Sequence, residues 1–242
     1  MTDRKIVAGL AAALLLSGCG EAAPAAQPDR AAAAAVAAAA EPAIPVTGPE
    51  RRILAFGDSL FAGYNVRPDE SYPAQLQDAL RARGINAEVT NAGVSGDTTA
   101  AGRARLAFTL DVQEAKPDLV ILELGGNDLL RGLPPAQTRE NLAAMLAELR
   151  RRDIPVLLMG MRAPPNLGAD FVNRFDAIYP ELAREYETEL VPFFLESIYT
   201  QPQLIQPDRV HPTAQGIETL VGATVNDVVA ALPEKAEAVA AR

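Results

Sequence analysis

Three side chains in this sequence could together carry out nucleophilic catalysis: Ser59, Asp208 and His211. A serine hydroxyl is a weak nucleophile until a neighbouring base removes its proton. His211 is the only histidine in the 242 residues, so it alone could supply an imidazole base. Asp208 precedes it by three residues, close enough on a turn to accept the imidazole Nδ1–H and direct the other ring nitrogen towards the serine. A lone histidine near a C-terminus is more often a surface residue, and that alternative stays open on these residues alone.

A reaction at an acyl carbonyl also needs hydrogen-bond donors where negative charge develops, and three groups could supply them. Ser59 offers its own backbone N–H at the start of a helix-like turn. Gly96 lies in the segment SGDT at residues 95–98, where a residue without a Cβ lets the backbone approach a ligand closely. Asn127 offers a side-chain amide. Glycine and asparagine are also ordinary turn residues, so each signal is weak when taken alone.

The elements that must position these residues alternate between strand and helix, which predicts a doubly wound α/β sheet. Short apolar runs predict strands at residues 52–56, 87–90, 119–124, 155–159 and 190–193. Helical patterns predict helices at residues 71–83, 102–114, 138–151, 171–186 and 213–230. We expect Thr138 to cap the third helix, Pro180 to kink or split the fourth, and Pro192 to place the last strand at a sheet edge.

Sheet topology then predicts where the chemical residues meet. In open α/β sheets the ligand site lies beyond the carboxyl ends of the strands. The segments that follow the five predicted strands there contain residues 57–59, 91–98, 125–128, 162–168 and 208–211. We therefore expect all of them at one edge of the sheet.

Composition excludes several classes of function. The chain carries 22 Lys and Arg against 31 Asp and Glu, a net charge of −9 with no basic block, which argues against nucleic-acid binding. Cys19 is the only cysteine, so no intrachain disulfide can form. With one histidine and one cysteine, a zinc or copper site built from several such ligands is nearly excluded. Hydrophobic residues make up 49% of the chain, enough for one sizeable core.

The N-terminus has the pattern of an export signal. Arg4 and Lys5 precede an apolar run at residues 6–16, which is shorter than the roughly 20 residues needed to span a membrane. The run ends in LSGC at residues 16–19, which resembles the bacterial lipobox and implies cleavage after residue 18 and lipidation of Cys19. An ordinary signal peptide that happens to contain a cysteine is the alternative.

This pattern predicts a lipid-anchored protein of the bacterial cell envelope that faces the periplasm. Gly20 follows the cysteine where an inner-membrane retention signal would have Asp, which favours the outer membrane. The domain boundaries that we expect are a signal at 1–18, an Ala- and Pro-rich tether at 19–50, a catalytic domain at 51–232 and a tail at 233–242.

Four segments occur in the order of the sequence blocks of the SGNH (GDSL) hydrolases. They are GDSL at residues 57–60, GVSGDT at 93–98, GGND at 125–128 and DRVHP at 208–212. The resemblance covers about residues 51–232 and is greatest to the bacterial thioesterase, lysophospholipase and arylesterase group. The serine does not lie in a Gly-x-Ser-x-Gly elbow, which argues against the α/β-hydrolase fold.

This resemblance implies a three-layer α/β/α sandwich of flavodoxin-like type with a five-stranded parallel sheet. It implies that Ser59 is the nucleophile, that His211 is the general base and then acid, and that Asp208 orients His211. The Ser59 N–H, the Gly96 N–H and the Asn127 amide would form the oxyanion hole. The implied enzyme is a monomeric carboxylic ester hydrolase that needs no metal or organic cofactor.

The substrate is predicted less sharply. Segments 129–135 and 163–168 could form the walls of an apolar acyl pocket, with Leu130 and Leu133 as candidate wall residues. An envelope location favours aryl esters, lysophospholipids or other lipid esters over acyl-CoA, although thioesters could react. One alternative is a carbohydrate O-acetyl esterase, disfavoured because aromatic residues are only 5% and tryptophan is absent. The other is a non-catalytic surface lipoprotein that binds acyl chains.

Several charged residues near these segments allow two interpretations. Asp58 and Asp97 could polarise the site, but an aspartate beside a turn more often caps backbone N–H groups, and we favour capping. Arg67, Arg131 and Arg162 could surround the pocket, but solvated surface charge is the more common role.

Overall fold

A parallel sheet of five strands organises residues 46–234, the part of the chain that this computed structural model describes. The predicted signal at 1–18, Cys19, most of the predicted tether and residues 235–242 of the predicted tail lie outside the described residues. The strand order is β2-β1-β3-β4-β5. The strands are β1 (Arg51–Gly57), β2 (Ala87–Gly93), β3 (Leu119–Glu123), β4 (Val156–Met159) and β5 (Glu189–Val191). The predicted five-stranded parallel sheet is therefore confirmed.

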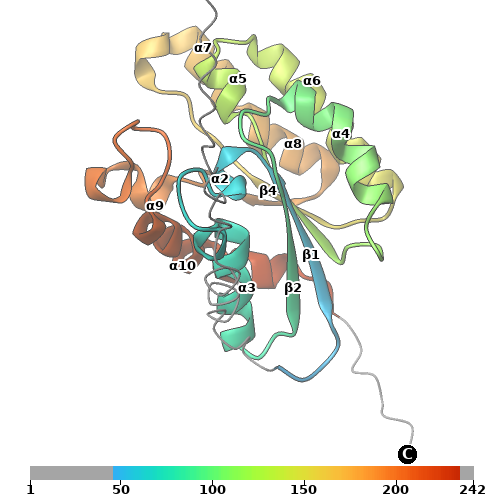
Figure 1. The fold of residues 1–242 in the computed structure, drawn as a ribbon. Coiled ribbons are helices and arrows are strands. Elements are labelled where there is room, and N and C mark those ends of the chain that lie inside the picture. Colours follow the sequence, from blue (N-terminus) through green and yellow to red (C-terminus); the bar gives the residue numbers. More distant parts are fainter. Residues whose placement is uncertain (1–45, 235–242) are drawn as a thin grey trace, which may run out of the picture. The chain divides into compact units, whose positions relative to one another are not determined.

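Helices cover both faces of this sheet and complete a three-layer sandwich (Figure 1). On one face, α3 (Tyr72–Ala82) packs beside α10 (Ala214–Ala231), and the Tyr72 hydroxyl lies 2.7 Å from Thr224 Oγ1 in a buried hydrogen bond. The helices of the other face are α4 (Thr99–Asp111), α6 (Pro135–Arg151) and α8 (Ile178–Tyr186). Among the described residues, no helix combines the length and apolarity that a membrane crossing requires.

Burial follows strand position. All five residues of β3, in the middle of the sheet, are buried, and so are Ile53 to Gly57 of β1. Central parallel strands are covered on both faces, which explains their almost continuous apolar sequence. β2 and β5 form the edges and are partly exposed. β5 lies at an edge, as predicted, but it ends at Val191 rather than at residue 193, so Pro192 lies outside the strand.

The register of the strands brings their carboxyl ends together. Gly57 pairs with Gly93 on one side and with Glu123 on the other, and Met159 pairs with both Glu123 and Val191. The loops after all five strands therefore leave from one edge of the sheet. At the opposite edge Arg51 donates a 2.7 Å hydrogen bond to the Pro233 carbonyl, so the start of β1 lies beside the end of α10.

Two helices begin three residues earlier than predicted. α4 begins at Thr99 rather than residue 102, because the Thr98 hydroxyl accepts the Ala101 N–H and caps the helix earlier. α6 begins at Pro135, so Thr138 is not its N-cap. Instead, the Thr138 hydroxyl donates to the buried Asp128 carboxylate (3.3 Å).

The predicted helix at 171–186 is split into α7 (Ala169–Asp176) and α8. Pro180 lies in the first turn of α8, where its missing N–H costs no helical hydrogen bond. β2 runs to Gly93, three residues beyond the prediction, because pairing with β1 overrides the poor strand propensity of Asn91 and Gly93. The remaining short elements are α2 (Ser59–Ala62), α5 (Gly126–Leu130), α9 (Glu196–Tyr199), η1 (Pro68–Glu70), η2 (Pro165–Leu167) and η3 (Pro202–Leu204).

Candidate active site

Ser59 is presented by a tight turn at the end of β1. Asp58 caps the short helix α2, because its Oδ1 accepts the Leu60 N–H at 3.0 Å, and Ser59 is the first helical residue. The turn lies against the end of β2: a Cβ added to Gly93 would be 2.3 Å from the Ala62 nitrogen. Glycine at position 93 therefore permits the close approach that fixes the direction of Ser59.

His211 reaches Ser59 from the other end of the sequence. Its Nε2 lies 2.9 Å from Ser59 Oγ, and its Nδ1 lies 2.7 Å from Asp208 Oδ2. An ionised carboxylate only accepts hydrogen bonds, so Nδ1 carries the proton and Nε2 is left to accept the serine proton. The three predicted catalytic residues thus lie in one hydrogen-bonded chain, with His211 and Asp208 on the loop before α10.

The loop around His211 is held by its own backbone. Asp208 Oδ1 accepts the N–H groups of Val210 (2.9 Å) and His211 (3.0 Å). Arg209 between them has φ of 61°, in the left-handed region that a non-glycine residue seldom adopts. Desolvation acts to raise the pKa of Asp208, but hydrogen bonds from His211 and from these N–H groups outweigh it, and the pKa is lowered. Asp208 therefore stays ionised opposite the imidazole.

The three residues of the predicted oxyanion hole, Ser59, Gly96 and Asn127, line one pocket. Gly96 has φ of 86°, and an added Cβ would meet nothing closer than Arg131 Nη2 at 3.7 Å, so its conformation rather than a lack of space requires glycine. The Arg131 guanidinium donates to the Gly96 carbonyl (2.8 Å), and Asn127 Nδ2 donates to Asp58 Oδ2 (3.0 Å).

A buried network holds the segment that carries Asn127. Asp128, which is 1% exposed, accepts the Thr99 N–H (2.8 Å), the Thr99 hydroxyl (2.5 Å) and the Thr138 hydroxyl. These bonds tie α5 to the starts of α4 and α6. The network was not predicted, because the spacing of Asp128 and Thr99 in the sequence does not reveal their contact.

Asp58 and Asp97, for which the sequence allows two interpretations, make different contacts. Asp97 forms a 2.6 Å ion pair with Arg105, whose guanidinium also donates to the Gly57 carbonyl and lies over the Phe56 ring. Its role is structural, as expected, but Asp97 pairs with Arg105 and caps no backbone N–H group in the part of the chain that the structure describes. Asp58 caps α2, as expected, but it also contacts the predicted oxyanion-hole residue Asn127.

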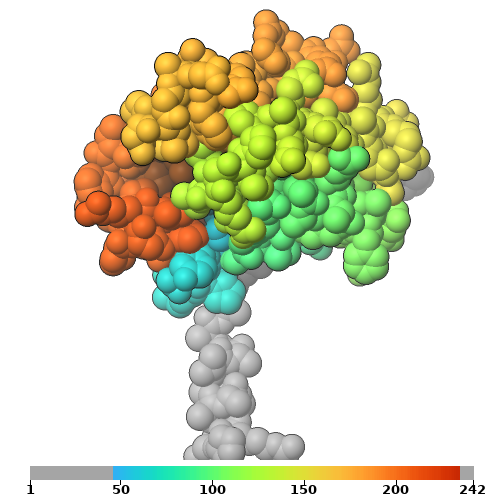
Figure 2. Space-filling view, turned by 90° about the horizontal axis from the view of Figure 1, so that it is seen from above, coloured from blue at the N-terminus to red at the C-terminus, as the bar shows by residue number. Residues whose placement is uncertain are grey.

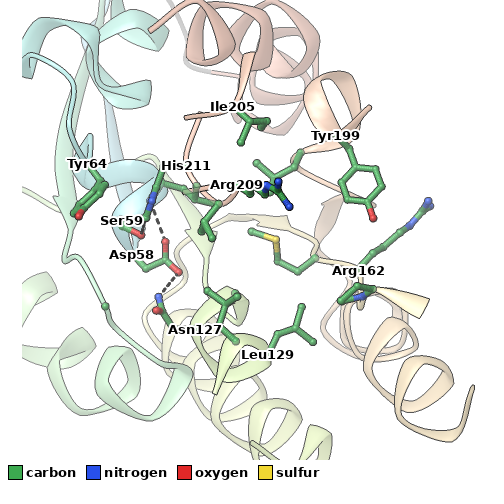
Figure 3. A pocket seen from close by; sticks show the side chains of 18 of the residues that line it. Asp58, Ser59, Tyr64, Asn127, Leu129, Arg162, Tyr199, Ile205, Arg209 and His211 are labelled. Carbon is green, nitrogen blue, oxygen red and sulfur yellow. Dashed lines mark hydrogen bonds between the residues drawn. The ribbon is translucent and has the colours of Figure 1, made fainter. Parts of the chain in front are cut away.

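Ser59 opens into a pocket of about 490 Å³. Figure 2 looks onto this side of the molecule, where a hollow lies between the yellow-green segment after β3 and the orange and red segments that follow later strands. Ser59, His211 and Asn127 lie at one end, and Arg162 and Tyr199 lie at the other (Figure 3). The pocket therefore extends well beyond the reactive serine.

The lining of the pocket is mainly apolar, and sequence reasoning found only part of it. Leu130 and Pro164 come from the two predicted wall segments, but Leu133 is not a lining residue. The prediction missed six large apolar or aromatic lining residues: Tyr64, Met161, Phe193, Leu195, Tyr199 and Ile205. The apolar segment at 190–193 was a signal for Phe193. Tyr199 lies in the four-residue helix α9, and the other four lie outside the helices and strands, so none of these five residues belongs to a periodic pattern.

Only some of the arginines near the site line the pocket. Arg162 lines the pocket, 5.5 Å from the centre of the Phe193 ring, and Arg209, which was not predicted there, also lines it. Arg67 is not among the lining residues and pairs with Asp69 and Glu70. Within residues 46–234, no three His, Cys, Asp or Glu side chains are grouped as a metal ion would require.

Known proteins resemble this chain in sequence and in fold. The model of the GDSL-like lipase/acylhydrolase family matches residues 55–218. An arylesterase of Vibrio mimicus is 43% identical over 161 residues, which cover 66% of this chain and 80% of that protein. The thioesterase 1/protease 1/lysophospholipase L1 of Escherichia coli strain K12 is 42% identical over 160 residues, covering 66% of this chain and 74% of the relative. The crystal structure of AlinE4, an SGNH-hydrolase family esterase, is 64% identical with a TM-score of 0.66, and the match covers 78% of this chain and all (100%) of that chain.

Proposed function

The chain belongs to the GDSL-like lipase/acylhydrolase family and is a serine esterase, and we propose that it hydrolyses acyl esters through an acyl-enzyme on Ser59. The observation that carries this mechanism is the continuous hydrogen-bonded chain from Ser59 Oγ through His211 to Asp208. Family membership decides against the non-catalytic lipoprotein that the sequence left open.

The proposed reaction has two displacements. His211 Nε2 takes the Ser59 proton as Oγ attacks the acyl carbon, and the carbonyl electrons move onto oxygen. The Ser59 N–H, the Gly96 N–H and the Asn127 amide stabilise that oxyanion. As the intermediate collapses, His211 protonates the leaving alcohol or thiol. Water, deprotonated by His211, then attacks the acyl-enzyme, and the acid leaves as the proton returns to Ser59. Asp208 holds the imidazole throughout.

The substrates that we propose are aryl esters, lysophospholipids or other lipid esters, and also thioesters. The supporting observation is the apolar lining formed by Leu130, Met161, Phe193 and Ile205, which suits an acyl chain longer than acetyl. A carbohydrate O-acetyl ester is the second candidate, because Tyr64 and Tyr199 line the same pocket and are 43% and 59% exposed. Such rings could stack on a sugar despite the low aromatic content.

Hydrolysis of p-nitrophenyl esters from acetyl to long-chain acyl groups tests both parts of this proposal. The purified protein should hydrolyse them, and Ser59→Ala should lose roughly 10³-fold or more in kcat/KM. A fluorophosphonate should label the wild-type protein and not the variant. A rate maximum at acetyl would replace the acyl-lipid proposal with the carbohydrate ester. Equal rates and equal labelling in both proteins would contradict a Ser59 acyl-enzyme.

We also propose that Cys19 is lipidated and that the protein is anchored in the bacterial cell envelope, facing the periplasm, with the outer membrane favoured. The support is LSGC at residues 16–19 followed by Gly20. Residues 19–50 would then form the tether, 51–232 the catalytic domain and 233–242 the tail. An alkyne fatty acid fed to expressing cells should label the wild-type chain and not Cys19→Ser. Light scattering of the purified protein tests the monomer that we expect.

A further inference from the structure

Glu123 places a buried carboxyl beside Asp58 in the Ser59 turn, and the proposed reaction does not use it. Glu123 is the last residue of β3 and has no exposed surface (0%). Its Oε2 accepts the Asp58 N–H at 3.3 Å, whereas its Oε1 has no hydrogen-bond partner among the described residues. A Cβ on Gly57 would lie 2.9 Å from Glu123 Oε2, so the glycine of the serine turn leaves the room that this side chain occupies.

Glu123 and Asp58 form a pair of buried carboxyls without a bridging cation. Asp58 is 2% exposed, and within residues 46–234 neither carboxyl forms an ion pair with Lys, Arg or His. Arg105 is close, but its guanidinium is bonded to Asp97 and to the Gly57 carbonyl. Two adjacent buried carboxylates cannot both remain ionised at moderate cost, so one of the two holds a proton.

The hydrogen bonds indicate which carboxyl is neutral. Asp58 accepts from the Leu60 N–H and from Asn127 Nδ2, both at 3.0 Å, which favours its charged form. Glu123 accepts only one long bond and has a bare oxygen. Burial, together with the negative charge of Asp58, raises the pKa of Glu123 well above its usual range. Burial also raises the pKa of Asp58, but the hydrogen bonds from Leu60 and Asn127 oppose that rise.

We propose that Glu123 is a positioning residue for the oxyanion hole, acting as a neutral carboxylic acid that keeps Asp58 in place and ionised next to Asn127. This inference rests on the proposed function. Asn127 Nδ2 has two hydrogens, and the one donated to Asp58 fixes the direction of the other. A charged acceptor holds an amide more firmly than a neutral one, so the proton on Glu123 controls how well the second hydrogen is aimed at the oxyanion.

Substitutions of Glu123, made in the wild-type protein and in an Asn127→Ala background, test this inference. Glu123→Met removes the carboxyl at similar size, and we expect kcat to fall roughly tenfold to a hundredfold with KM changed by less than about threefold, because a donor of this kind contributes about 10²–10³ to kcat. Glu123→Gln keeps a neutral donor and acceptor and should recover most of that loss. In an Asn127→Ala background, Glu123→Met should lower kcat by less than about threefold, because the effect passes through Asn127.

A core substitution on the same strand provides the control. Ile121→Ala also removes a fully buried β3 side chain, and it should lower thermal stability while leaving kcat close to wild type. If Glu123→Met lowers kcat by the same factor with and without Asn127, or if Glu123→Gln is as slow as Glu123→Met, Glu123 is only a structural residue and the inference is wrong.

A spectroscopic measurement covers the case in which Glu123→Met does not fold. The infrared spectrum of the wild-type protein at neutral pH should contain the carbonyl stretch of a protonated carboxyl, and Glu123→Gln should lack it. A wild-type spectrum without that band would overturn the inference. Labelling of Ser59 by fluorophosphonate tests the proposed function separately. If Ser59 is labelled but Glu123→Met lowers kcat equally with and without Asn127, the positioning role of Glu123 is rejected and the proposed function stands.

Discussion

The two sides of Ser59 are built in opposite ways. The base side consists of His211 and Asp208 on one loop, where Asp208 is exposed and its bonds are made mainly within residues 206–211. The oxyanion side consists of residues at the ends of β1, β2 and β3 and in the loops that follow them. There the Asp58 N–H donates to Glu123, Asn127 Nδ2 donates to Asp58, and the Thr99 N–H donates to Asp128. Catalysis and stability should therefore separate: substitutions of the catalytic residues on the base side should affect mainly the rate, and substitutions on the oxyanion side should affect both.

Asp208→Asn is the strongest test of the base side. The amide would favour the wrong tautomer of His211, and kcat should fall by roughly 10³–10⁴ while the melting temperature near neutral pH changes little. Steady-state kinetics and thermal unfolding of the same preparation measure both. A large loss of stability would show that the loop is not an independent unit.

The same variant gives a pH prediction with a definite sign. The pKa of Asp208 is lowered in the folded protein, so its contribution to the free energy of unfolding is present above the unfolded pKa of about 3.9. That contribution is lost as the pH falls through the lowered folded value. Between neutral pH and this acid range, wild-type stability should therefore fall slightly more steeply than that of Asp208→Asn. Parallel curves would contradict this.

Asp128→Ala is the corresponding test of the oxyanion side. It leaves the Thr99 N–H and two hydroxyls without their acceptor in a buried site, and the free energy of unfolding should fall by about 3 kcal/mol. Urea unfolding measures this value. Thr138→Val removes one donor only, and its cost should be about 1 kcal/mol. If both variants lose equal stability, the three bonds do not act as one buried network.

Gly96→Ala should have an intermediate effect. The left-handed φ of 86° disfavours alanine by about 1–2 kcal/mol, although the space for a Cβ exists. The backbone should shift to relieve this strain and misalign the Gly96 N–H, so we expect kcat to fall roughly tenfold to a hundredfold. A fall in stability without a change in kcat would remove Gly96 from the oxyanion hole.

The smallest predicted effect returns to the base side. Arg209 has φ of 61°, and Arg209→Gly should raise the free energy of unfolding by about 0.5–1 kcal/mol because glycine adopts this conformation without strain. Denaturant midpoints would detect the gain. An unchanged or lower midpoint would mean that contacts of the Arg209 side chain outweigh the backbone strain.

Sequence predicted the base side better than the oxyanion side for a physical reason. Asp208 and His211 are neighbours in the chain, and the alternation of strands and helices places them at the same edge as Ser59. Glu123 instead looks like one polar residue in an apolar strand, and only the register that pairs it with Gly57 reveals its position. Thr138 fits the pattern of a helix cap in the sequence, but in the folded protein its hydroxyl donates to Asp128 instead. Tyr64 lies in a turn and Tyr199 in the four-residue helix α9, which is too short to show a period, so their place in the pocket could not be predicted.

The hydrogen bond between Arg51 and Pro233 has a consequence for protein engineering. Because the two ends of the sandwich are adjacent and far from the catalytic edge, a short linker could join them and new termini could be opened in a surface loop such as the one between α6 and β4. Circular permutants of this kind are tolerated where the ends are close and exposed. For the same reason, the whole sandwich could be inserted into a loop of another protein with its pocket facing outward.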